Sequence, residues 1–141
     1  MKQDTCRDVK TVLALAPDTY TDTANGEIVD CEGFGGATLA LLVGAATYAD
    51  GAAFTVGLEH GDTANLSDAT AVPNAQVVGM HAAEDLSAYL AYTEAPTAPQ
   101  VVEIGYLGEK QYLRLTLTKT ASPSGVFGAV ATLQNPARRP I

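Results

Sequence analysis

The sequence contains no tryptophan, and aromatic residues make up only 6% of it. Without many large rings, a core has to be built from small and branched apolar side chains, and these pack well between two β-sheets. Long apolar runs are missing as well, since no stretch approaches the roughly 20 residues of a membrane-spanning helix. The first ten residues are polar and lack the apolar segment of a secretory signal. We therefore expect a soluble intracellular product, or a mature chain whose signal is missing.

Cationic side chains are absent from 11–109, although all acidic residues except Asp4 and Asp8 lie in that range. The cations near the C-terminus are Lys110, Arg114, Lys119, Arg138 and Arg139. The formal net charge of −8 disfavours nucleic acid and anionic membranes as partners. An acidic body joined to a basic end predicts either charge compensation within one fold, or an interface with a second copy or another charged surface.

Cysteine is scarce, since Cys6 and Cys31 are the only two. Two cysteines do not make a disulfide framework, and thiols stay free inside most cells. We expect free thiols, with a disulfide between the two as the alternative. His60 and His81 lie in no zinc or protease motif, which favours a core or surface role over metal binding.

Catalytic and nucleotide-binding motifs are also missing. The sequence has no Gly-x-Ser-x-Gly elbow, and the segment 105–110 has too few residues between its glycines for a phosphate-binding loop. The glycines of 33–36 lead into a predicted strand and indicate a bend or bulge. The acidic segment 18–27 breaks the spacing of a calcium loop, so a polar loop is expected. We therefore expect no enzymatic activity, no cofactor and no metal site.

Turn-forming residues recur between short apolar runs, and this pattern is typical of a β-sandwich or barrel. Strands are predicted over 9–16, 27–31, 38–43, 53–60, 77–80, 102–106, 112–120 and 126–133, whereas 82–92 fits a short helix or an edge strand. We expect a single all-β domain, a jelly-roll-like β-sandwich of seven or eight strands. Asn25-Gly26 and Asp50-Gly51 are expected to form tight turns.

Alternation of apolar and polar residues predicts which side chains are buried. The predicted core includes Leu39, Leu41, Phe54, Val56, Ile104, Leu113, Leu115 and Phe127. The first strand is expected to place Leu13 and Leu15 on one face. The strand 38–43 is apolar on both faces and is expected to be covered on both. The last three strands are expected to form a meander in which Arg114 points outward.

The sandwich is expected to occupy residues 1–134, and 135–141 are expected to form an extended basic tail. Arg138 and Arg139 lie between Pro136 and Pro140. Proline has no backbone N–H to donate, so the tail is not expected to join a sheet.

The segment 102–115, VEIGYLGEKQYLRL, resembles a motif of small structural proteins of tailed bacteriophages. In that motif a Gly-Tyr-aliphatic-Gly sequence, a short basic turn and a Tyr-aliphatic-Arg sequence form a hairpin. The matching positions here are Gly105, Tyr106, Leu107, Gly108, Lys110, Tyr112, Leu113 and Arg114. Gln111 stands where a base is expected. The closing segments 125–130 and 136–140 are also similar to the ending of that family, whereas 61–99 shows no similarity.

The resemblance implies a capsid decoration (cement) protein, made in the host cytoplasm and located on the exterior of the virion. Its partner would be the major capsid protein, whose shell it strengthens. Tyrosine and arginine are common interface hot spots. The residues expected at the interface are Tyr106, Lys110, Tyr112, Arg114, Arg138 and Arg139. A homodimer is also expected, through complementary charges or β-edges. The alternative is a tail, baseplate or head-fibre component that binds protein or carbohydrate.

Overall fold

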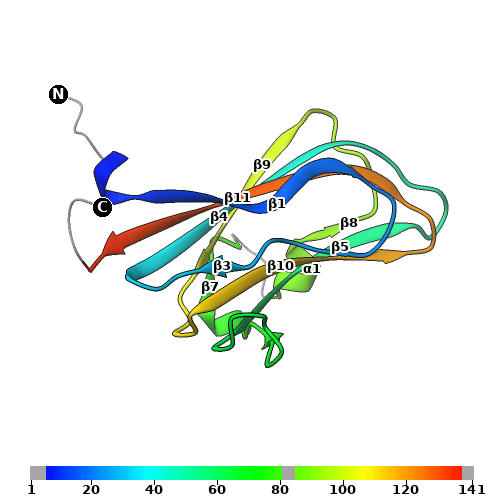
Figure 1. The fold of residues 1–141 in the computed structure, drawn as a ribbon. Helices are drawn as coiled ribbons and strands as arrows, with labels where there is room; N and C mark the ends of the chain where they lie inside the picture. The colour runs from blue at the N-terminus through cyan, green and yellow to red at the C-terminus, as the bar shows by residue number, and fades with distance from the viewer. Residues whose placement is uncertain (1–5, 81–84, 138–141) are drawn as a thin grey trace.

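The computed structural model describes residues 6–80 and 85–137, which form two antiparallel β-sheets packed face to face (Figure 1). The first sheet contains, in spatial order, β1 (Lys10–Tyr20), β11 (Ser124–Pro136), β4 (Phe34–Thr47), β9 (Gln100–Tyr106) and β7 (Val77–Val78). The second sheet contains β2 (Ala24–Asn25), β10 (Tyr112–Thr120), β5 (Ala53–Gly61) and β6 (Thr70–Ala71), with β3 (Val29–Asp30) on β10 and β8 (Ala91–Tyr92) on β5. The helical segments are η1 (Cys6–Asp8), η2 (Asn74–Gln76) and α1 (Leu86–Tyr89).

This architecture confirms the predicted all-β sandwich. The described residues form more strands than expected because β2 and β6, which were not predicted, and β8, which lies within 82–92, add to the predicted ones. β2 and β6 are only two residues long, and such short strands show no alternating pattern from which they can be predicted. β3 and β7 are equally short but lie within the predicted strands 27–31 and 77–80. In the described part of the chain, no helix is long and apolar enough to cross a membrane.

The core lies between the two sheets. All the side chains predicted to be buried are at most 1% exposed. The rings of Phe54 on β5 and Phe127 on β11 meet edge to face with their centroids 5.4 Å apart, so they join the second sheet to the first. Tyr92 packs against the same Phe127 ring, with a centroid distance of 5.6 Å. Burial of this continuous apolar cluster is the main source of stability.

The last three strands do not form the expected meander. β9 pairs with β4, β10 pairs with β5, and β11 pairs with β1 and β4, so the chain changes sheet at both connections. The prediction was wrong because alternation shows which face of a strand is buried, but either sheet can bury that face. Crossings between sheets of this kind are typical of Greek-key sandwiches.

β1 differs from the predicted first strand in its faces and its length. Leu15 is buried, as expected, but Leu13 is 46% exposed. The pairing with β11 shifts register between Leu13 and Leu15, and again between Leu15 and Asp18. A bulge inserts an extra residue and turns the side chains that follow it to the other face. β1 then continues to Tyr20, through residues that were expected to form a loop.

β4 lies in the middle of the first sheet, as predicted, but only one of its faces is covered. Leu39 and Leu41 are buried in the core, whereas Leu42 is 46% exposed on the opposite face. The expectation of cover on both faces was wrong because the described residues form two layers, and none of them makes a third layer over either outer face.

The two predicted turns differ in the structure. Gly51 adopts a positive φ of 76° between β4 and β5, as a tight turn requires, although these strands lie in different sheets. Asn25 belongs to β2, and Gly26 donates its N–H to the Leu115 carbonyl at 2.7 Å, so this pair is not a turn. A Cβ on Gly26 would meet the carbonyl oxygen of Ala14. Glycine is therefore needed there because two backbones approach closely.

The two least regular parts of the chain also differ from the expectations. The segment predicted as a helix or an edge strand contains both: α1 begins after Asp85, whose carboxylate accepts the Ser87 N–H at 3.0 Å, and β8 follows. At the C-terminus, β11 runs on to Pro136, which pairs with Phe34, so the strand extends into the expected tail. Residues 138–141, with Arg138 and Arg139, lie outside the described part of the chain.

Candidate functional site

The segment that resembles the phage motif lies at one end of the sandwich. Because β9 and β10 belong to different sheets, residues 107–111 join the two layers and do not close a hairpin. We call 107–111 the inter-sheet connection. Leu107 donates its N–H to the Gln76 carbonyl at 2.7 Å, which ties the start of the connection to η2. The Leu107 side chain is 60% exposed, and sequence analysis did not identify it as a contact residue.

Tyr106 is buried, and it holds the inter-sheet connection from inside. Its side chain is 4% exposed, and its hydroxyl oxygen lies 2.7 Å from His60 Nδ1. The same hydroxyl accepts the backbone N–H of Lys110 at 3.3 Å. Burial raises the pKa of Tyr106, so the phenol stays protonated at neutral pH. The structure therefore gives Tyr106 a positioning role and leaves only a small part of its surface exposed.

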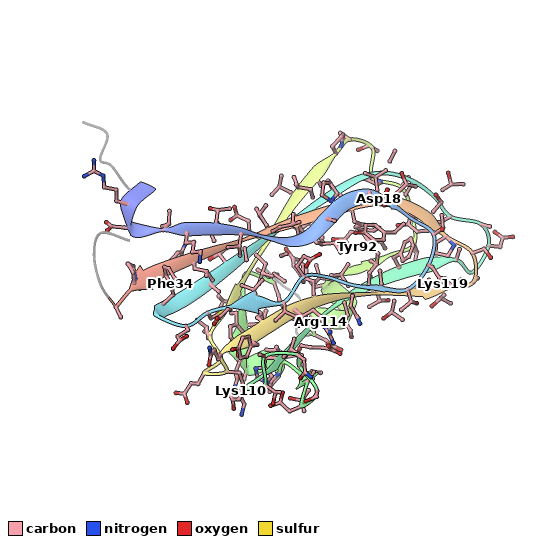
Figure 2. The ribbon with its side chains drawn as sticks, in the orientation of Figure 1. Asp18, Phe34, Tyr92, Lys110, Arg114 and Lys119 are labelled. Carbon is pink, nitrogen blue, oxygen red and sulfur yellow. The ribbon has the colours of Figure 1, made fainter. Side chains whose placement is uncertain are left out.

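The described cations of the basic end are all paired with acids of the same chain. The pairs are Lys110 Nζ with Asp62 Oδ2 at 2.8 Å, Arg114 Nη2 with Glu59 Oε2 at 2.6 Å, and Lys119 Nζ with Asp22 Oδ1 at 3.2 Å. Figure 2 shows Lys110 and Lys119 near opposite ends of β10, with Arg114 between them. Arg114 points outward, as predicted. Every acid in these pairs comes from the acidic body, which supports charge compensation within one fold.

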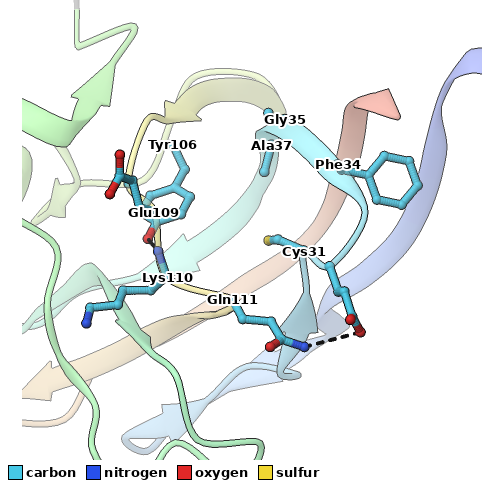
Figure 3. Close-up of a pocket in the computed structure, with 11 residues that line it drawn as sticks. Cys31, Phe34, Gly35, Ala37, Tyr106, Glu109, Lys110 and Gln111 are labelled. Atoms are coloured by element: carbon cyan, nitrogen blue, oxygen red, sulfur yellow. Dashed lines mark hydrogen bonds between the residues drawn. The ribbon is translucent and has the colours of Figure 1, made fainter. Parts of the chain in front are cut away.

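Gln111 links the inter-sheet connection to the segment before β4. Its side-chain amide donates to Asp30 Oδ1 at 3.1 Å and to the Tyr112 hydroxyl at 3.2 Å. A longer contact of 3.5 Å reaches Glu32 (Figure 3). Tyr112 is half-buried, so part of its ring is available to a partner. The neutral amide thus occupies a place between two acids where the resemblance leads us to expect a base.

A pocket of about 410 Å³ opens beside the inter-sheet connection (Figure 3). Its lining consists of Cys31, Phe34, Ala37 and Tyr106, the glycines Gly35, Gly36 and Gly108, and the polar residues Glu32, Glu109, Lys110 and Gln111. Two segments far apart in sequence supply its walls: 31–37, which follows β3, and 106–111, which begins at the end of β9. The pocket thus combines a wall of glycines with charges of both signs.

Cys31 carries a free thiol at this pocket. Burial, and to a smaller extent the charge of Asp30, raises the pKa of Cys31 to about 11. The thiol is therefore protonated at neutral pH, and a protonated thiol is a poor nucleophile and a poor metal ligand. The side chain of Cys6 lies outside the described part of the structure.

Within 6–80 and 85–137, no group of three or more His, Cys, Asp or Glu side chains is placed to hold a metal ion. His60 fills the core, with 6% of its surface exposed, and His81 lies outside the described residues. No model of a known protein family matches the sequence, and no curated protein matches it.

Proposed function

We propose that the protein is a capsid decoration protein of a tailed bacteriophage, which binds the major capsid protein on the outer surface of the head and stabilises its lattice. One observation carries the proposal. The inter-sheet connection, within the segment that resembles the phage motif, is held in place from both sheets while its tip remains exposed.

The contacts behind the connection make it rigid before any partner binds. The backbone of Leu107 is tied to Gln76, that of Lys110 to Tyr106, and the side chain of Gln111 to Asp30. A surface that is already ordered loses little conformational entropy on binding, and this improves affinity. A decoration protein also gains from repetition, because many copies stand on one lattice.

Charge on this end suits a protein surface of mixed character. The Lys110 and Asp62 side chains are 46% and 59% exposed, so their ion pair remains within reach of a partner. Leu107 adds an apolar contact beside them. Exposed pairs of this kind contribute little to stability, so they remain free to exchange partners at an interface.

The alternative is a tail, baseplate or head-fibre component, and its carbohydrate-binding version is disfavoured by the aromatic side chains. Sugar sites usually present exposed rings, yet the six Tyr and three Phe are all buried or half-buried, and the chain has no Trp. Protein binding is therefore the better supported version of either role.

Co-sedimentation with phage particles tests the proposal. The virus is the one whose genome carries the gene for this protein beside the gene for the major capsid protein. Purified protein is mixed separately with undecorated expanded heads and with tails of that virus. We expect saturable binding to heads only. Leu107→Asp should weaken binding at least about tenfold, whereas Thr118→Asp, near the far end of β10, should bind like the parent. Binding to tails instead of heads would establish the alternative, and binding to neither would refute both.

A further inference from the structure

The outer face of the first sheet is unusually apolar for a surface. Most of the large apolar side chains that are well exposed among the described residues lie on it: Leu13, Leu42, Val78, Val101 and Val126. In antiparallel pairs, directly opposite residues share a face. The pairing places Leu13 beside Val130 and Leu42 beside Val101, so these side chains form continuous rows across the strands. Scattered apolar residues on a surface are ordinary, but a contiguous patch marks an interaction site.

This apolar face carries almost no charge. From the Thr11–Thr132 pair to the Leu42–Val101 pair, Glu103 is the only charged side chain that points outward among the described residues. Glu103 lies on β9, toward the side of the sheet. The face therefore offers nothing that would select a strongly acidic or strongly basic partner.

The outer face of the second sheet is different, so apolar character is not general to this surface. There the Arg114–Glu59 ion pair spans the β10–β5 ladder, and Thr118 pairs with Thr55. A sandwich exposed to water on both sides needs two polar faces, as the second sheet has. The outer face of the first sheet is not polar.

The apolar face also contains a groove. A groove of about 490 Å³ is lined by Pro17, Leu42, Gly44, Val101, Val126 and Gly128. Gly44 and Gly128 place no side chains in the groove, and a Cβ on Gly128 would lie 3.2 Å from Pro17. The Leu13–Val130 row lies beside this groove, because Val130 and Gly128 point to the same face of β11. A two-fold axis between the row and the groove would place the row of one copy against the groove of the other.

We infer that a second copy of this chain covers the apolar face in a two-fold dimer. Elsewhere the charge of −8 on each copy opposes contact, so this face, where Glu103 is the one described charge, is where two copies approach at least electrostatic cost. Four strands about 4.8 Å apart, paired over about eight residues, present a face of roughly 20 by 25 Å. With its protruding side chains, this face approaches the roughly 800 Å² per partner of a standard interface. The inference is independent of capsid binding, which we assign to the inter-sheet connection.

Light scattering and sedimentation velocity over a wide concentration range test the dimer. The parent should show twice the 14.6 kDa chain mass. Leu42→Lys and Val101→Lys each bring two like charges into the proposed interface and should raise the dissociation constant at least about a hundredfold. Thr118→Lys adds the same charge to the outer face of the second sheet, and its dissociation constant should equal that of the parent.

A third variant distinguishes loss of the dimer from misfolding caused by a lysine on the central strand. Leu13→Lys changes the same face on β1, which lies at the edge of the first sheet, where a new side chain is easily accommodated. It should also give monomers, with a circular dichroism spectrum like that of the parent. A parent that stays monomeric at all concentrations, an assembly of another order, or a dimer that survives all three lysine variants would overturn the inference.

Discussion

His60 on β5 and Tyr106 on β9 join the two sheets through a hydrogen bond of 2.7 Å between His60 Nδ1 and the Tyr106 hydroxyl. Their rings meet edge to face, with centroids 5.7 Å apart. The hydroxyl accepts the Lys110 N–H and can donate its own proton to Nδ1 when His60 is neutral and protonated at Nε2. One buried polar contact thus connects the core to the candidate site.

Removing the Tyr106 hydroxyl should destabilise the protein. Tyr106→Phe keeps the ring but leaves His60 Nδ1 and the Lys110 N–H without this partner. We expect the free energy of unfolding in urea to fall by about 1–3 kcal/mol, because unsatisfied buried groups lose their hydration. The matched control is Tyr112→Phe, whose half-buried hydroxyl accepts from Gln111; its effect should stay within about 0.5 kcal/mol. Equal effects of the two variants would contradict the positioning role.

Stability should depend on pH through His60. Burial, followed by the charge of Lys110, holds the pKa of His60 below its ordinary value, against a smaller opposing effect of Asp62. The unfolded chain therefore takes up the proton more readily, and the free energy of unfolding decreases as the pH falls through about 6.5 toward the lower folded pKa. We expect a lower Tm at about pH 5.5 than at about pH 7.5, and a smaller difference in His60→Gln.

The titration of Asp22 and Asp62 does not contribute to the change of Tm between these two pH values. The pKa values of Asp22 and Asp62 are lowered from 3.8, by the Thr23 N–H and by Lys110 respectively, so these carboxylates lose their stabilising charge only at more acidic pH. If the parent and His60→Gln show the same change of Tm over this range, another group is responsible.

The Arg114–Glu59 pair should contribute more to stability than the exposed pair at Lys119. The Arg114 and Glu59 side chains are 18% and 30% exposed, and two guanidinium nitrogens donate to one carboxylate oxygen. Arg114→Ala should lower the free energy of unfolding by about 1–2 kcal/mol. Lys119→Ala breaks a pair that is largely in water and should change it by less than about 0.5 kcal/mol. Thermal and urea unfolding of both variants measure the difference.

Gly26 should not tolerate a side chain. In Gly26→Ala the new Cβ would meet the Ala14 carbonyl oxygen and lie 3.1 Å from that of Leu115, so the backbones must move apart. We expect a loss of about 1–3 kcal/mol in the free energy of unfolding. Gly36→Ala is the control, because its Cβ would have only an ordinary contact of 3.7 Å with Asn135. A Gly26→Ala variant as stable as the parent would show that this close approach is not required.

Much of the fold follows from local patterns in the sequence. Leu113 and Leu115 are buried and Arg114 points outward because side chains alternate along a strand, whatever that strand pairs with. The turn at Gly51 and the apolar runs are likewise properties of short segments, and the absence of Trp is a property of the composition. They were enough to predict an all-β sandwich and its core.

The candidate site depended on contacts between segments distant in the chain. Lys110 reaches Asp62 across 48 positions, and Arg114 reaches Glu59 across 55. Nothing in the segment around either cation shows that its charge is already compensated. Tyr106 looked like a contact residue beside a turn, but the partner that buries its hydroxyl, His60, lies 46 positions away on the other sheet.

By itself, the sequence determined the class of fold, most of the side chains that enter the core and the separation of charge along the chain, because these depend on periodicity and composition. Only the tertiary structure decided which sheet each strand joins, which cations are paired and which apolar side chains remain outside. Leu42 shows the difference: its apolar neighbours predicted burial, but a two-layer sandwich leaves it 46% exposed, since none of the described segments packs as a third layer on the first sheet.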